Sequence, residues 1–167
     1  MLIDPTYFTS GPRHITNASL GTMPNANATE VGAAIMGYVD AYQERFLAEA
    51  VGHKYANKIH DYLLCLEEGD KVSVEAYDEI CQRLKEAFAE YVFFHILGQT
   101  SSQATITGLV RLKCANTYVP PHHAQIQAWN RMTDRMRDFV DWCAESSPLD
   151  GIETSSELTT YLNILNI

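Results

Sequence analysis

The sequence predicts a mostly α-helical protein: a bundle of about four helices, with an extended arm or a small β-hairpin between the third and the last long helix. Three observations support this prediction. Apolar residues recur at spacings of three and four over several long stretches, which is typical of amphipathic helices. Glycine and proline separate these stretches. One segment between them is β-branched and alternates instead. With 167 residues, the chain is long enough for one domain with its own core.

Residues 1–28 are expected to form an irregular N-terminal segment. They are rich in Gly, Pro, Asn, Ser and Thr, and their three prolines oppose regular structure. Asn27 or Thr29 is the expected N-cap of the first helix, which Gly52 should end. The segment is expected to lie over the bundle surface, because it carries the apolar residues Leu2, Ile3, Tyr7, Phe8 and Ile15.

Two further helices are predicted before the insertion. The shorter one spans residues 53–66, and its expected buried side is Tyr55, Ile59, Tyr62, Leu63 and Leu66. The longer one spans residues 74–97, with Ser73 as its expected N-cap. Residues 91–97 are apolar or aromatic on every side of the helix, so this end should be buried under a neighbouring element.

The helical rhythm stops over residues 99–119, a long connection for a compact helical domain. Pro120-Pro121 begins the last long helix, because proline fits the first helical turn, and Pro148 and Gly151 end it. Residues 158–167 are expected to form a short helix or a terminal strand.

The predicted organisation has three parts. Residues 1–28 are the N-terminal segment, residues 29–145 the helical domain with its arm at 99–119, and residues 146–167 a C-terminal tail.

Composition excludes several classes of protein. The chain has 46% hydrophobic residues and a net charge of −9, which indicates a globular protein and opposes a general nucleic-acid coat. The first residues lack the basic and apolar regions of a secretory signal. No apolar run approaches the roughly 20 residues that a spanning helix needs, so we expect no membrane segment.

The charge is unevenly distributed. Residues 61–90 carry nine acids and three bases, whereas residues 91–133 carry no acid and only three bases, which are Arg111, Lys113 and Arg131. One interpretation is that part of this acid-free stretch is core or loop. The other is a mildly cationic surface that meets a negative partner, which includes a second copy of the chain.

Familiar catalytic and cofactor motifs are not found. The spacing of Gly32 and Gly37 imitates a phosphate-binding loop, but Tyr38 stands where lysine is needed and the segment is helical. The four cysteines have no zinc-ligand spacing, and we expect them to be reduced thiols; they are Cys65, Cys81, Cys114 and Cys143. The sequence therefore predicts no enzyme activity, no cofactor and no metal site.

Several polar residues have both a functional and a structural interpretation. Glu49, His53 and His60 have a spacing that could align metal ligands, but Gly52 should end the helix between them. The adjacent pair His122-His123 diverges by about 100° around a helix, so the two cannot share a metal without distortion.

Structural roles are the preferred interpretation for the other polar residues. His95 is expected to be a hydrogen-bonded core residue, and Glu86 and Glu90 to lie on a solvated face. Trp129-Asn130 is expected to bond to the arm that precedes it.

An ordered set of stretches resembles a family of small proteins of Bacteroidetes phages and prophages, placed among head–tail connector or adaptor proteins. The stretches are Tyr38–Leu47 running into Val51–Tyr55, then Leu84–Phe94, the Thr/Gly arm ending in Lys113-Cys114-Ala115-Asn116, and Ala128–Met132. The resemblance covers residues 35–143. It departs from the family at Ala50-Val51-Gly52, where Leu-Leu-Gly or Leu-Gly is usual, and the two ends of the chain match poorly.

The resemblance implies a non-enzymatic structural subunit that forms a ring between portal and tail. Its expected partners are other copies of itself and the portal and tail proteins, with no membrane and no sequence-specific nucleic acid. Its expected location is the bacterial host cytoplasm during assembly, and the virion if the phage is active. A ring of this kind uses a heterologous interface.

The acid-free arm is the predicted subunit interface. We expect it to reach the acidic 61–90 surface of the adjacent copy, through Thr105, Ile106, Leu109, Arg111 and Lys113. Positive arms that point into the lumen of such a ring are compatible with DNA passing through it.

Two alternatives stay open. One is a helical ligand-binding or protein-interaction module, with tyrosines and Trp129 lining a pocket. The other is a small hydrolase or metal enzyme that uses His53, His60 or His122.

Overall fold

The structure is a computed structural model that describes residues 1–15, 26–69, 74–100, 102–105, 108–111 and 121–163. Most of these residues are helical. The α-helices are α1 (Ala26–Val51), α2 (His53–Glu67), α3 (Glu75–Thr100) and α4 (Pro121–Ser146). The prediction of a mostly α-helical bundle is therefore confirmed.

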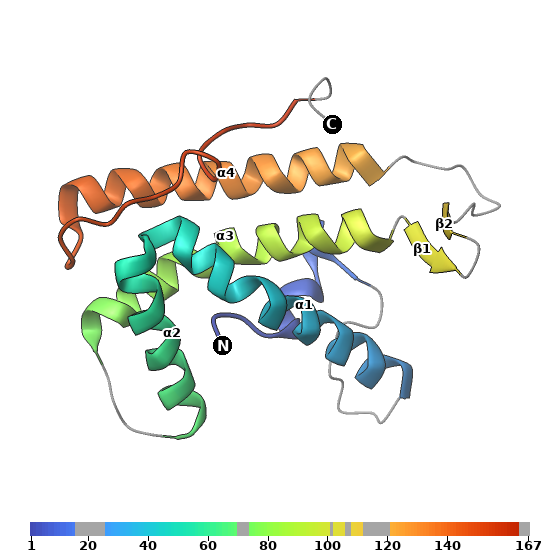
Figure 1. Cartoon of the computed structure of the whole chain (residues 1–167), viewed down its shortest axis with the longest axis horizontal. Coiled ribbons are helices and arrows are strands. Elements are labelled where there is room, and N and C mark those ends of the chain that lie inside the picture. The colour runs from blue at the N-terminus through green and yellow to red at the C-terminus, as the bar shows by residue number, and fades with distance from the viewer. Residues whose placement is uncertain (16–25, 70–73, 101, 106–107, 112–120, 164–167) are drawn as a thin grey trace.

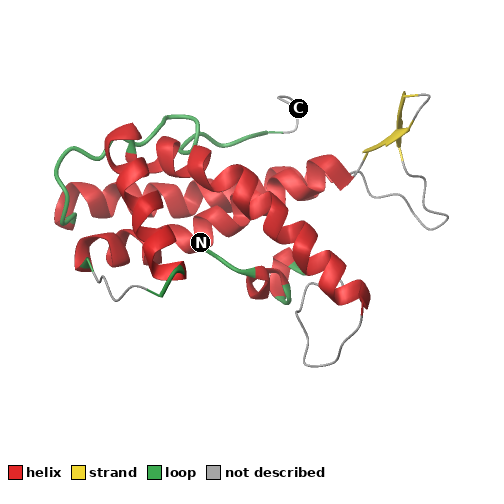
Figure 2. Ribbon diagram, turned by 60° about the horizontal axis from the view of Figure 1, so that its bottom comes forward, coloured by secondary structure: helices red, strands yellow, loops and turns green. Residues whose placement is uncertain are grey.

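Helices α3 and α4 lie side by side and antiparallel, and together they form the longest part of the bundle (Figures 1 and 2). α1 packs against both α2 and α3. Gly52 separates α1 from α2 and has a φ of 77°, in the left-handed region that favours glycine. This break confirms the predicted end of the first helix, and it lets α2 fold back along α1.

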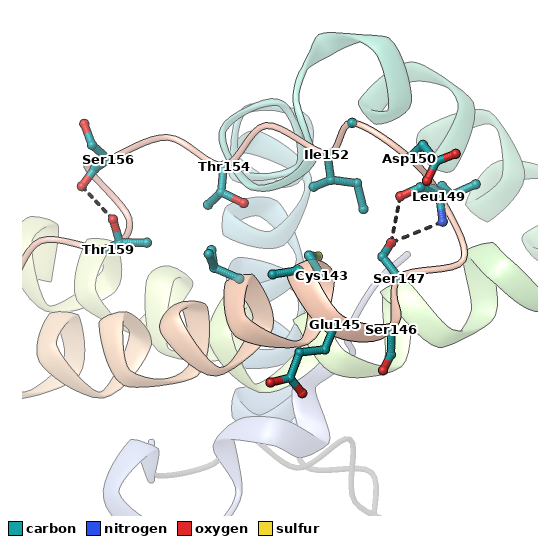
Figure 3. A pocket seen from close by; sticks show the side chains of 13 residues that line it. Cys143, Glu145, Ser146, Ser147, Leu149, Asp150, Ile152, Thr154, Ser156 and Thr159 are labelled. Carbon is teal, nitrogen blue, oxygen red and sulfur yellow. Dashed lines mark hydrogen bonds between the residues drawn. The ribbon is translucent and has the colours of Figure 1, made fainter.

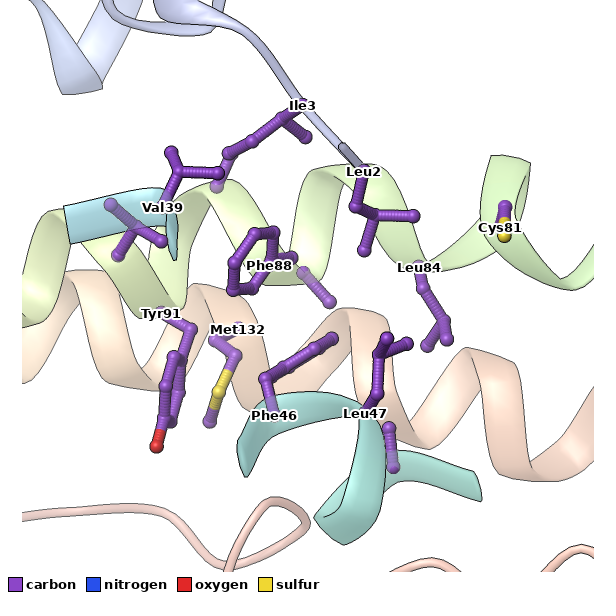
Figure 4. Close-up of a cluster of buried hydrophobic side chains, with 14 of the residues drawn as sticks. Leu2, Ile3, Val39, Phe46, Leu47, Cys81, Leu84, Phe88, Tyr91 and Met132 are labelled. Atoms are coloured by element: carbon purple, nitrogen blue, oxygen red, sulfur yellow. The ribbon is translucent and has the colours of Figure 1, made fainter. Parts of the chain in front are cut away.

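The core lies where α1, α3 and α4 meet. Figure 4 shows Phe46 and Leu47 of α1 facing Leu84 and Phe88 of α3, with Met132 of α4 beside them. All five side chains are fully buried. Each Å² of apolar surface that is buried on folding stabilises the folded state by roughly 25 cal/mol, so this cluster contributes strongly to stability.

Between α3 and α4 the chain forms two four-residue strands, β1 (Ser102–Thr105) and β2 (Gly108–Arg111). They pair antiparallel, with Ser102 opposite Arg111 and Thr105 opposite Gly108. We call residues 99–119 the arm.

Residues 1–15, the described part of the N-terminal segment before α1, cover one side of the bundle, as predicted from their apolar residues. Leu2 and Ile3 are buried against α1 and α3, and Phe8 is fully buried (Figure 4). The backbone N–H of Leu2 donates to the side chain of Gln43 in α1 at 2.6 Å. Residues Pro5–Phe8 and Gly11–Arg13 form two short 3₁₀ helices, the first capped by Asp4.

Glu90 of α3 is the buried charge at the centre of this arrangement. It is only 4% exposed, which corrects the expected solvated face. Arg131 of α4 donates to both of its carboxylate oxygens, Nε at 2.9 Å and Nη2 at 2.8 Å. Arg13 donates to the same carboxylate through Nη1 at 3.0 Å, and its Nη2 lies 2.8 Å from Glu86. Glu90 therefore joins the N-terminal segment, α3 and α4.

The tail after α4 runs back along the bundle as an irregular strap (Figure 1). It caps the end of α1 with two hydrogen bonds. The backbone N–H of Ser155 donates to the Glu49 carbonyl at 2.7 Å, and the hydroxyl of Thr154 donates to the Ala50 carbonyl at 2.8 Å. Its described part is neither helix nor strand over residues 158–163, so the expectation of a terminal element is wrong there.

Contacts with the tail also correct the expected role of Trp129-Asn130. The indole of Trp129 donates to the Thr160 carbonyl at 2.9 Å, and Asn130 exchanges two hydrogen bonds with the backbone of Leu162, at 3.1 and 2.9 Å. The two residues hold the tail, which follows α4, and not the arm, which precedes it.

The helix starts differ most from the sequence-based expectations. Asn27 and Thr29 both lie inside α1, which begins at Ala26, so neither is its N-cap. Ser73 lies outside the described residues, and α3 begins at Glu75. Helix periodicity fixes the middle of a helix better than its ends.

We predict that Glu90→Gln lowers the free energy of unfolding by about 3 to 5 kcal/mol, because it removes the charge that two arginines share in a buried site. Glu86→Gln is the matched control. Its side chain is 49% exposed, so the loss should stay below about 1 kcal/mol. Urea unfolding of the two variants measures both values. Equal losses would contradict the central role of Glu90.

Candidate functional site

The predicted interface residues belong to the arm. Thr105, Leu109 and Arg111 lie in the paired strands, whereas Ile106 and Lys113 lie outside the described residues. Alternate positions of a strand share one face. By the register, positions 109 and 111 are therefore on one face of the ribbon and position 105 is on the other.

An acidic surface lies at the opposite end of α3. Glu67 and Glu68 end α2, Glu75 and Glu79 lie in the first two turns of α3, and all four side chains are exposed. Two of them have partners in their own chain. Glu67 pairs with the N-terminal amino group, and Glu79 lies 3.5 Å from Arg83. The local excess of carboxylates makes this surface attractive to cations.

A groove of about 980 Å³ runs between α2 and α3 beside these acids. Its apolar lining includes Leu63, Leu66 and Cys81, and its charged lining includes Glu75, Asp78, Glu79, Arg83 and Lys85. Leu66 is 42% exposed, although its helical spacing predicted a buried position. Sequence reasoning missed the groove, because its shape depends on how α2 folds back toward α3.

More than half of the length of α3 separates the groove from the arm. At 1.5 Å per residue, 26 helical residues span about 38 Å, and Figure 1 shows the strands beyond one end of α3 and α2 beside the other. Within one chain, the acidic surface and the paired strands therefore lie at opposite ends of α3.

A second pocket lies between the end of α4 and the tail, with a volume of about 620 Å³ (Figure 3). Its lining is rich in hydroxyls and includes one thiol, Cys143, beside Ile152 and Thr154 of the tail. Burial raises the pKa of Cys143 to about 11, so the thiol is protonated and a poor nucleophile at neutral pH. No histidine lines this pocket, so its residues do not form a cysteine–histidine pair.

The histidines named in the enzyme alternative lie apart in the structure. His53 lines a hollow beside α1 together with Glu49, but Glu49 is hydrogen-bonded to Arg45 at 2.8 Å. The Nδ1 of His60 is buried and has no hydrogen-bond partner in the described part of the chain. His122 is exposed in the first turn of α4. Among the residues that the structure describes, no three His, Cys, Asp or Glu side chains come together as metal ligands.

His95 lies in an aromatic cluster between α1, α3 and α4. Its ring stacks on Tyr42 at 3.9 Å between centroids and meets Tyr91 edge-on at 4.7 Å. Its Nε2 is buried and has no hydrogen-bond partner among the residues that the structure describes, so this atom does not meet the expected hydrogen-bonded state. Burial first, and then the charge of Arg45, lower the pKa of His95 to about 4.

The comparisons with known proteins add no further assignment. A scan of protein-family models, a search of curated proteins and a search of solved structures each return no match to this chain. In the parts of the chain with described structure, no helix is both long and apolar enough to cross a membrane.

We predict that His95 makes the protein less stable in acid. Its pKa is about 4 in the folded chain, against the ordinary histidine value of 6.5 that applies when the chain is unfolded, so the unfolded state takes up the proton first as the pH falls. The free energy of unfolding should therefore fall between pH 6.5 and pH 4. His95→Phe keeps a ring against Tyr42 and removes this proton, so it should reduce the slope. Urea midpoints measured across this range test the difference, and identical slopes would contradict it.

Proposed function

We propose that the chain is a non-enzymatic structural subunit of a phage or prophage head–tail connector, which assembles through contacts between subunits, between portal and tail. The observation that carries the proposal is the position of the arm. The paired strands extend beyond the ends of α3 and α4, away from the helical bundle (Figure 2). A two-stranded ribbon is marginally stable alone, so a neighbour that packs against it would stabilise it.

The separation of charge along α3 supports assembly between copies. The acid-free stretch includes the arm with Arg111 and Lys113, and the acidic surface lies at the other end of the helix. Complementary surfaces at opposite ends of one subunit join head to tail. Such a heterologous contact closes into a ring when the rotation between neighbours allows it.

The packing of the bundle also suits a structural subunit. The N-terminal segment, α3 and α4 share the buried carboxylate of Glu90, and the tail caps α1. These contacts support the proposal, because a ring of defined size requires subunits with a well-packed body. The proposed partners outside the ring are the portal and tail proteins, in the host cytoplasm during assembly and in the finished virion.

If the chain joins heads to tails, a phage that lacks it should not form complete particles. Deleting the gene of this chain from an inducible prophage should yield heads and tails that remain separate, because the piece between them is missing. Electron microscopy of the induced lysate and a count of infectious particles measure this outcome.

Complementation provides the controls for this experiment. A wild-type copy of the gene supplied in trans should restore complete particles. A copy with Lys54→Glu and Lys58→Glu should do the same, because these exposed lysines lie on α2, away from the arm. Complete, infectious particles from the deletion itself would contradict the proposed function.

A further inference from the structure

We propose that the groove between α2 and α3 is the acceptor site for the arm of a second copy of this chain. The inference rests on the proposed function, because it names the surfaces through which the subunits would join. Three features favour the arm as the segment that binds there: the lining of the groove, the charge around it and the length of α3.

The lining of the groove is mixed, and Leu66 is its exposed apolar side chain among exposed charged ones. Leu63, Leu66, Cys81 and Tyr62 contribute to it, and Leu66 leaves 42% of its surface exposed. An accessible leucine in a concave surface is typical of an interaction site, because a partner can remove it from water. Position 109 of β2 is a leucine, and it shares one face of the ribbon with position 111, an arginine, so one face of β2 offers an apolar residue beside a cationic one.

The charges around the groove favour a cationic segment. Glu75, Asp78 and Glu79 line it from the first two turns of α3. Asp78 accepts a hydrogen bond from Tyr62 at 2.5 Å, so it is partly committed within the chain. Glu75 and Glu79 are exposed, as Asp78 is. The contact of Glu79 with Arg83 is an exposed pair of small energy, which a partner's cation can replace.

Three cationic groups lie in the lining, and each is held by its own chain: the N-terminal amino group of Met1 pairs with Glu67, and the other two are Arg83 and Lys85. Arg83 stacks over the ring of Trp142 at 4.2 Å, besides its contact with Glu79, and Lys85 donates to Gln82 at 3.1 Å. Arg111 and Lys113 are the only Lys or Arg residues of the arm, which has no acid. The arm can therefore bring positive charge to Glu75 and Glu79 without adding a repelling carboxylate.

The length of α3 decides which copy supplies the arm. The groove is lined by the N-terminal part of α3, as far as Lys85, and the arm follows the C-terminal end of that helix at Thr100, about 22 Å farther along its axis. A chain cannot place β2 in its own groove while α3 stays intact. Each copy therefore offers one arm and one groove to different neighbours, which is a heterologous contact.

A charge-exchange experiment on the full chain tests this site. The donor variant carries Arg111→Glu and Lys113→Glu, and the acceptor variant carries Glu75→Lys and Glu79→Lys. Each should weaken self-association at low salt about tenfold or more, as measured by sedimentation velocity over a range of protein concentrations. The chain with all four substitutions should regain association, because both partners have changed sign.

Two matched controls separate the groove from general effects of charge and of apolar surface. The double variant Asp138→Lys and Asp141→Lys reverses the charge of two exposed acids of α4. It should leave the association constant within about twofold of wild type. Leu66→Ser should weaken association. Leu64→Ser should not, because Leu64 is 45% exposed on the same helix but does not line the groove.

The outcomes distinguish this inference from the proposed function. Loss of association in the donor and acceptor variants, with recovery in the combined chain, supports the groove. Wild-type association in the acceptor variant overturns the groove, and so does a wild-type chain that stays monomeric at low salt and high concentration. Neither result changes the particles that form after gene deletion, which test the function separately.

Discussion

The buried carboxylate of Glu90 is the interaction on which the arrangement of the chain depends. Removing a carboxylate from water costs several kcal/mol, and a full set of charged donors must offset that cost. Arg131 supplies two of them from α4 and Arg13 supplies one from the N-terminal segment. α3 and α4 therefore pack in the register that places Arg131 opposite Glu90, and residues 1–15 close over the same place.

This fixed helical pair gives the subunit two different ends. One end carries the arm, and the other carries the groove between α2 and α3 with its exposed acids. The net charge of −9 is unevenly distributed along the sequence, with nine acids in residues 61–90 and no acid in residues 91–133. The buried contacts of Glu90 lie between these two ends. Two unlike ends allow identical copies to add in one direction.

The helical class and the break at Gly52 are predictable from the sequence, because periodic apolar residues and a left-handed glycine are local signals. Prediction fails where the partner lies far along the chain. Helical spacing alone suggests a solvated face for Glu90, because Arg13 is 77 residues away. The contacts of Trp129 and Asn130 escape prediction because the tail offers them backbone atoms, which no residue type reveals. Leu66 follows helical spacing and is still 42% exposed, because the groove depends on the packing of α2 against α3.

The symmetry of the assembled protein tests the central claim most directly. Negative-stain electron microscopy and native mass spectrometry of the full chain at low ionic strength would determine it. Head-to-tail contacts between unlike ends predict closed rings, in which every subunit has the same environment, or open chains of more than two copies. A two-fold symmetric dimer that does not grow would contradict the account, because such a dimer joins like surfaces.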